Sequence, residues 1–212
     1  MNAAQSVKPR CSITLVLGGV RSGKSRFAQE LAQRVGGGDV LFVATAEARD
    51  GEMAERVAHH RKSRPSGWRT LEQPREIAAA LNQQPKLPTV VLVDCLTLLV
   101  SNILCASPSH DIDRLIHGIE TEIDALIQAV DDNTTHLIVV SGEVGQGIVP
   151  EHAMGRVFRD LLGWANQRLA KQATTTYWMI AGLAIDATHL QTSTEQAAEK
   201  LLAAQVLHVR ES

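Results

Sequence analysis

A glycine-rich loop with the sequence GGVRSGKS occupies residues 18–25, after a short apolar segment and before an amphipathic one that begins RFAQELAQR. It matches the pattern G-x-x-x-x-G-K-S/T, which cradles phosphate when a strand precedes it and a helix follows it. Gly18 and Gly23 let the backbone curl so that its N–H groups line a phosphate, and the positive end of the following helix adds to the attraction. In such a loop Lys24 reaches the β- and γ-phosphates, and the hydroxyl of Ser25 binds Mg²⁺. A chance match in a glycine-rich turn is the alternative, but the context predicts a nucleoside triphosphate site.

Apolar runs of strand length alternate with longer amphipathic segments along the chain. This order predicts an α/β domain with a mainly parallel sheet covered by helices on both faces, the RecA-like P-loop fold. We expect strands at residues 12–17, 39–44, 89–94, 135–141 and 174–180, with shorter candidates at 68–71 and 206–209. We expect helices at residues 24–35, 50–61, 74–82, 96–105, 111–130, 153–173 and 193–204. Residues 1–11 are expected to be a mobile lead-in, residues 12–185 one domain, and residues 186–212 a helical extension packed on it.

Composition excludes several functional classes. The 212 residues include 21 Lys and Arg against 23 Asp and Glu, so no overall positive field exists to hold nucleic acid or an anionic membrane. No apolar run approaches the roughly 20 residues that cross a bilayer, and the first eleven residues do not form a signal peptide, so we expect a cytoplasmic protein. Cys11, Cys95 and Cys105 are odd in number, and two of them lie in hydrophobic runs, which favours reduced core residues over a disulfide or metal site.

Asp94 follows four consecutive apolar residues, 90–93, at the expected end of a buried strand. P-loop sites place a second carboxylate for Mg²⁺ at such a position, so Asp94 is a candidate metal ligand. The alternative is that Asp94 caps the helix that follows, and both roles could coexist.

A cluster of basic residues lies in the segment AERVAHHRKSRPSGW, where His59 and His60 stand beside Arg61, Lys62 and Arg64. The cations could hold a triphosphate and keep a histidine neutral, so that its free ring nitrogen could attack phosphorus. Adjacent helical side chains point about 100° apart, so we expect only one of the two histidines to face a site. A solvated basic helix end remains an alternative, whereas a zinc site lacks a third ligand at suitable spacing.

Five segments together resemble one known family. They are GGVRSGKSRFAQELA, FVATAEARDGEMAERVAHHRKSRPSGWRTLEQP, LVDCLTLLVSNIL, VSGEVGQGIVPEHAMGRVFRDLLGWANQRLA and WMIAGL. The family is the bifunctional adenosylcobinamide kinase and adenosylcobinamide-phosphate guanylyltransferase of cobalamin biosynthesis, and the resemblance runs from about residue 13 to about residue 183. The ordered set of HHRKSRP, the E-V-G-x-G-I-V-P turn and the R-D-L-x-G-x-x-N-Q-R-L helix carries it, because the glycine loop alone is shared by many enzymes and switches.

The resemblance implies two reactions. In the first, ATP or GTP phosphorylates the hydroxyl of the aminopropanol arm of adenosylcobinamide. In the second, GTP donates GMP to that phosphate through a guanylylated histidine, which would be His60, giving adenosylcobinamide-GDP and pyrophosphate. Ping-pong kinetics would follow from the covalent intermediate. The resemblance also implies a homotrimer.

The resemblance assigns the site residues as follows. The phosphates would be bound by Gly18, Gly19, Val20, Arg21, Ser22, Gly23, Lys24 and Ser25. The nucleotide would be bordered by Ala44, Thr45, Ala46, Arg61, Lys62, Ser63 and Arg64, with further contacts from Glu72 and Asp94, and Mg²⁺ would be held by Ser25 and Asp94. A carboxylate at Glu72 could accept hydrogen bonds from the N1–H and N2 amino edge of guanine, although a solvated surface glutamate is the alternative.

One departure from the family pattern lies in S-G-E-V-G, where Gly142 replaces the asparagine usual before Glu143. Any contact of that amide is therefore absent or replaced, and Glu143 has either a functional role or a role in the turn. No general base for the kinase step can be assigned from the sequence. Two other functions remain open, a P-loop kinase without nucleotidyl transfer and a nucleotide-dependent switch or assembly ATPase.

Overall fold

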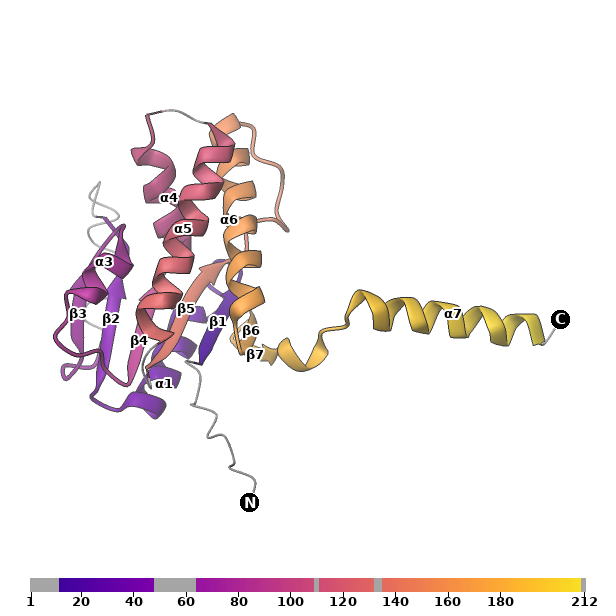
Figure 1. Cartoon of the computed structure of the whole chain (residues 1–212), viewed down its shortest axis with the longest axis horizontal. Helices are drawn as coiled ribbons and strands as arrows, with labels where there is room; N and C mark the ends of the chain where they lie inside the picture. The colour runs from indigo at the N-terminus through magenta and orange to yellow at the C-terminus, as the bar shows by residue number, and fades with distance from the viewer. Residues whose placement is uncertain (1–11, 48–63, 109–110, 132–134, 211–212) are drawn as a thin grey trace, which may run out of the picture.

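The computed structural model describes residues 12–47, 64–108, 111–131 and 135–210, with side chains described as far as residue 202. Within these residues a seven-stranded sheet has the order β3-β2-β4-β5-β1-β6-β7 (Figure 1). Its strands are β1 (Ile13–Gly18), β2 (Val40–Ala44), β3 (Arg69–Glu72), β4 (Val90–Asp94), β5 (His136–Gly142), β6 (Thr175–Ile180) and β7 (Leu183–Asp186). Neighbours pair in parallel except β6 and β7. β5 lies between β1, which leads into the glycine loop, and β4, which ends at Asp94, so the RecA-like P-loop fold is confirmed.

The central strands lie where uninterrupted apolar runs predict them. Every residue of β2 is buried, as are the first four residues of β4, because helices cover both faces of this parallel sheet. The five main expected strands each begin within one residue of the prediction, and β3 overlaps the shorter candidate at residues 68–71.

The helices form two unequal layers. They are α1 (Lys24–Gly36), α3 (Ile77–Asn82), α4 (Leu96–Ala106), α5 (Ile112–Asp131), α6 (Ala153–Gln172), the 3₁₀ turn η1 (Thr188–Leu190) and α7 (Thr194–Arg210). α3, α4, α5 and α6 share one hydrophobic cluster with one face of the sheet, and α4, α5 and α6 stand together on that face in Figure 1. Within the described residues, α1 and Trp68 pack on the opposite face. The helix expected at residues 50–61 lies outside the described residues.

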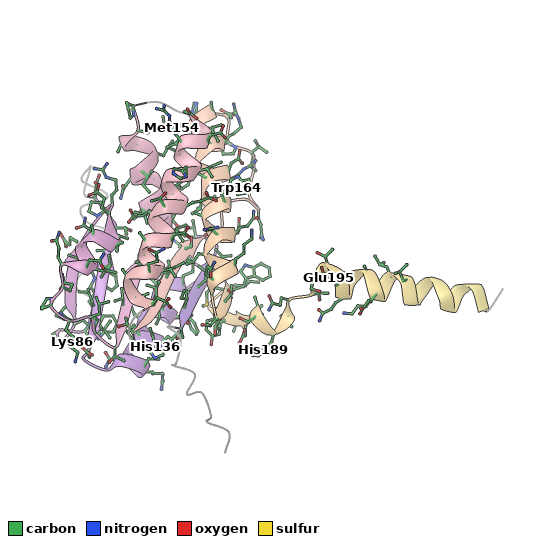
Figure 2. All side chains as sticks on the ribbon, viewed as in Figure 1. Lys86, His136, Met154, Trp164, His189 and Glu195 are labelled. Atoms are coloured by element: carbon green, nitrogen blue, oxygen red, sulfur yellow. The ribbon has the colours of Figure 1, made fainter. Side chains whose placement is uncertain are left out.

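The C-terminal part of the chain differs from the expectation. Residues 206–209 are not a strand, because they continue α7, which begins with reciprocal hydrogen bonds between Ser193 and Gln196. α7 extends away from the sheet instead of packing on the domain (Figure 1), and Glu195 near its start lies well clear of the sheet (Figure 2). β7 was not predicted, because it is a four-residue exposed edge strand without a long apolar run. It follows a tight turn in which Ala181 and Gly182 have φ values of 49° and 85°.

Two smaller expectations need correction. Cys105 is exposed at the end of α4 and Cys95 is half-buried, so neither is the fully buried core cysteine that the hydrophobic runs suggested, and Cys11 lies outside the described residues. α3 begins at Ile77, three residues later than predicted, after Glu76 in a left-handed conformation with φ 54°. The backbone N–H of Ile77 donates to Oε1 of Glu122 at 2.7 Å, which caps the short helix from α5.

Candidate active site

A cavity of about 530 Å³ lies where the carboxyl ends of the central strands meet the N-terminus of α1. This edge of a parallel α/β sheet is where ligands bind in such folds. The cavity is lined by Val20, Arg21, Ser22, Gly23, Lys24, Ser25, Arg26, Phe42, Ala44, Ala46, Arg64, Glu72, Asp94, Cys95, Thr97, Leu98, Val140, Gly142, Glu143 and Val144. It therefore brings together the glycine loop, the ends of β2, β3, β4 and β5, and the start of α4.

The glycine loop is fixed by close backbone packing. A Cβ on Gly18 would lie 2.5 Å from the carbonyl oxygen of Met179 on β6, so no larger residue fits there. Gly23 has φ 95° immediately before α1, a conformation that glycine adopts without steric cost. The N–H of Gly182 donates to the carbonyl oxygen of Ser22 at 2.9 Å and joins the loop to the β6–β7 turn. The loop is thus held at both ends, with Val20 to Ser25 facing the cavity.

Thr45 supports the cavity without lining it. It is fully buried, and its hydroxyl accepts the N–H of Cys95 and donates to the carbonyl oxygen of Cys95, both at 2.8 Å. The side chain of Asn102 donates to the carbonyl oxygen of Thr45 at 2.8 Å. These bonds hold the end of β2 against the start of α4, so that Ala44 and Ala46 border the cavity.

The candidate metal ligands Ser25 and Asp94 both line the cavity, next to Lys24. Their donor set is a hydroxyl and a carboxylate, the hard oxygen ligands that Mg²⁺ prefers. Among the described residues no group of three His, Cys, Asp or Glu side chains could hold a metal by itself. This fits Mg²⁺, which usually takes one or two protein ligands and completes its shell with substrate phosphates and water.

Arg64 is held against an aromatic side chain. Its guanidinium carbon lies 3.9 Å from the ring centroid of Phe42, a cation–π contact. Phe42 stacks on Trp68, with centroids 6.5 Å apart, and the indole N–H of Trp68 bonds Gln33 and the carbonyl oxygen of Gly37 at 3.0 Å each. One cation of the basic segment therefore reaches the cavity, whereas His60 and residues 61–63 lie outside the described residues.

The turn after β5 is fixed by a buried polar network. The N–H of Gly142 donates to Oγ1 of Thr97 at 2.7 Å, and the side chain of Asn166 donates to the carbonyl oxygen of Gly142 at 3.0 Å. The hydroxyl of Ser141 bonds Oδ1 of Asn166 at 2.6 Å. A Cβ on Gly142 would lie 2.9 Å from Oγ1 of Thr97, so the threonine hydroxyl fills the space where a longer residue would begin. This accounts for the glycine in place of asparagine.

The start of α4 contributes two residues to the cavity, Thr97 and Leu98, while Leu96 and Leu99 are buried in the core. Sequence reasoning missed Thr97 and Leu98, although a helix that begins directly after Asp94 was itself a signal. Phe42 and Val140 were also missed, because their side chains belong to the α1 face of the sheet and their facing could not be assigned from continuous apolar runs. Burial, together with the neighbouring charge of Asp94, raises the pKa of the Cys95 thiol to about 11, so this thiol is protonated at neutral pH.

No described helix is long and apolar enough to span a membrane. An ATPase domain among solved structures is 15% identical with a TM-score of 0.46, covering 79% of this chain and 68% of that one, a likeness too distant to support any conclusion. Three curated proteins are much more similar. The bifunctional adenosylcobalamin biosynthesis protein CobP of Pseudomonas aeruginosa is 41% identical over 80% of this chain and 93% of its own length. The proteins named CobU of Escherichia coli and Salmonella typhimurium are each 38% identical over 81% of this chain and 97% of their own length.

A family model described as cobinamide kinase / cobinamide phosphate guanyltransferase matches residues 14–187. This match covers the whole sheet and every element that lines the cavity, including the glycine loop and the turn after β5. The chain belongs to the cobinamide kinase / cobinamide phosphate guanyltransferase family.

Proposed function

We propose that this chain phosphorylates adenosylcobinamide with ATP or GTP and then transfers GMP from GTP to the adenosylcobinamide phosphate, within cobalamin biosynthesis. The observation that carries the proposal is the cavity in which Lys24, Ser25, Asp94 and Arg64 meet on the scaffold of this family. These residues supply two cations, a hydroxyl and a carboxylate around the position of a triphosphate.

We assign the nucleotide contacts to this chain by the same geometry. The backbone N–H groups of residues 18–25 and the N-terminal end of α1 would bind the phosphates, and the side chain of Lys24 would reach the β- and γ-phosphates. Arg64, with Arg61, Lys62 and Ser63 before it, would border the triphosphate, and Glu72 would accept hydrogen bonds from the guanine edge. Ser25 and Asp94 would hold Mg²⁺, which supplies charge neutralisation on the phosphate oxygens.

The guanylyl transfer would proceed in two displacements on His60. A ring nitrogen of His60 attacks the α-phosphorus of GTP, an N–P bond forms, and the bond from the α-phosphorus to the pyrophosphate oxygen breaks. A phosphate oxygen of adenosylcobinamide phosphate then attacks the same phosphorus, and the N–P bond breaks to give adenosylcobinamide-GDP. His60 is four residues from Arg64 along the chain, and that proximity to a cavity residue supports the assignment.

The experiment is to incubate the protein with Mg²⁺ and GTP labelled at the α-phosphate, in parallel with γ-labelled GTP. We expect acid-labile label on the protein from α-labelled GTP alone, lost in His60→Ala and retained in His59→Ala, the matched neighbour. His60→Ala should still phosphorylate adenosylcobinamide. A protein that binds GTP but forms no adduct would be a P-loop kinase or ATPase, and the guanylyltransferase half of the proposal would be wrong.

The homotrimer and the cytoplasmic location implied by the resemblance stay predictions. Trp164 on α6 is 52% exposed (Figure 2), so an apolar side chain is available for a subunit contact. Light scattering on the purified protein would give the number of subunits directly.

A further inference from the structure

Three carboxylates line the cavity among the residues that the structure describes: Glu72, Asp94 and Glu143. The proposed function uses the first for the guanine edge and the second for Mg²⁺, and leaves Glu143 without a role. Glu143 follows directly on β5, which pairs with β1 on one side and with β4 on the other. Glu72 ends β3, three strands away from β5 in the sheet. Of the two carboxylates that do not serve the metal, Glu143 is therefore the one beside the phosphate loop.

The backbone of Glu143 is tied to that loop. Its N–H donates to the carbonyl oxygen of Gly18 at 3.0 Å, and Gly18 is the first residue of the glycine loop. The preceding residue, Gly142, is held on both sides of its peptide unit by Thr97 and by the buried Asn166. The position of Glu143 relative to the phosphates is thus set by three hydrogen bonds to three different elements.

The side chain of Glu143 keeps acceptor capacity for a ligand. The residue is half-buried, and its Oε1 accepts the N–H of Gly145 at 2.5 Å. A carboxylate has about four lone-pair positions, so one such bond orients the group and leaves the other oxygen able to accept a proton. The bond also favours one orientation of a side chain that would otherwise rotate.

We propose that Glu143 is the proton acceptor of the kinase step, an inference that rests on the proposed function. The hydroxyl oxygen of the acceptor forms a bond to the γ-phosphorus, and the bond from that phosphorus to the leaving nucleoside diphosphate breaks. The hydroxyl proton passes to the carboxylate of Glu143 and from there to water. Guanylyl transfer needs no such base, because its attacking groups are the neutral imidazole of His60 and an ionised phosphate oxygen. Glu143 therefore serves one of the two reactions.

The test compares Glu143→Gln with the parent protein in the two reactions separately. Glutamine can still accept the N–H of Gly145 through its side-chain oxygen, so the turn is kept, but an amide does not act as the base. We expect kcat for phosphorylation of adenosylcobinamide to fall by about 100-fold or more. Labelling of the protein by α-labelled GTP and GMP transfer to supplied adenosylcobinamide phosphate should stay within about twofold, since neither uses this base. Glu151→Gln, at an exposed carboxylate just beyond the turn, is the matched control and should change neither reaction.

A second pair of variants tests the positioning of Glu143. Thr97→Val removes the acceptor for the N–H of Gly142, so the turn loses one of its anchors, whereas Thr97→Ser retains the hydroxyl. We expect Thr97→Val to lower kcat of phosphorylation while KM for the nucleotide stays the same, and Thr97→Ser to restore kcat. Circular dichroism on each variant checks that the fold is intact.

The outcomes separate this inference from the proposed function. If the parent protein phosphorylates adenosylcobinamide and Glu143→Gln does so within about threefold, the inference is wrong and the function stands. If phosphorylation and guanylylation fall together in Glu143→Gln, the residue acts in nucleotide binding, and the inference is again wrong. A parent protein without any phosphorylation of adenosylcobinamide would overturn both.

Discussion

Nζ of Lys24 donates a hydrogen bond of 2.7 Å to the carbonyl oxygen of Gly19, inside the loop that both residues belong to. The ammonium group is therefore already placed at the phosphate site, and a bound triphosphate would take over one of its three donors.

We expect Lys24→Ala to raise the Kd for GTP by about 10- to 100-fold, because hydrogen bonds to charged groups contribute about 1.5–3 kcal/mol. Titration calorimetry with a non-hydrolysable GTP analogue measures this directly. Lys171→Ala, at an exposed position in the last turn of α6, removes the same charge elsewhere and should leave Kd unchanged. Equal affinities in the two variants would contradict the assignment of the loop.

Arg64→Lys should weaken nucleotide binding by about threefold to tenfold, because lysine keeps the charge but loses the planar stacking on Phe42 that places it. The comparison is with Arg69→Lys, an exposed exchange on β3 that alters no cavity residue. The same calorimetric titration serves for both. A loss of affinity in Arg69→Lys as large as that in Arg64→Lys would show that the effect is one of net charge and not of position.

Much of the fold was predictable because its signals are local. The glycine loop follows β1 and opens α1 within one stretch of chain, and β2 and β4 are runs of apolar residues that only a doubly covered sheet can bury. The same locality placed Asp94 at the end of its strand. β7 and the direction of α7 lacked such signals, since an exposed edge strand and an isolated helix depend on what surrounds them.

The cavity was only partly predictable, because it is assembled across strands. Asp94 pairs with Ala44 on β2 and with Val140 on β5, and this register brings three distant segments to one edge. Thr97 fills the space beside Gly142 although 45 positions separate the two residues. No pattern within a single segment encodes such a contact, so Thr97, Phe42 and Val140 emerged only from the structure.

The two described cysteines should differ in reactivity towards an alkylating reagent. At pH 8, about three pH units below the pKa of the Cys95 thiol, roughly one thiol in a thousand is ionised, and the thiolate is the reactive form. Cys105 is exposed, so we expect it to be alkylated at least about tenfold faster than Cys95. Peptide mass spectrometry at timed intervals gives both rates, and unfolding in denaturant should abolish the difference. Faster modification of Cys95 in the folded protein would contradict the raised pKa.

Glu122 offers a test of how pH acts on stability. Burial raises the pKa of this carboxyl group above its usual range, although the hydrogen bond from the N–H of Ile77 opposes the shift. Because the folded state then favours the protonated form, the contribution of Glu122 to stability is full below its ordinary pKa. It is lost as pH rises through the raised value of the folded protein.

Glu122→Gln should therefore make the protein more stable than the parent near neutral pH. Glutamine has a similar size and its side-chain oxygen can accept the same N–H of Ile77, but it carries no charge to desolvate. The advantage over the parent should shrink as pH falls towards 4, where the parent carboxyl also becomes neutral. Urea unfolding of both proteins between pH 4 and pH 8 measures the difference, with Glu199→Gln, at an exposed carboxylate on α7, as the control for removing one negative charge. If the parent is the more stable protein at neutral pH, the capping bond to Ile77 outweighs the burial of the charge.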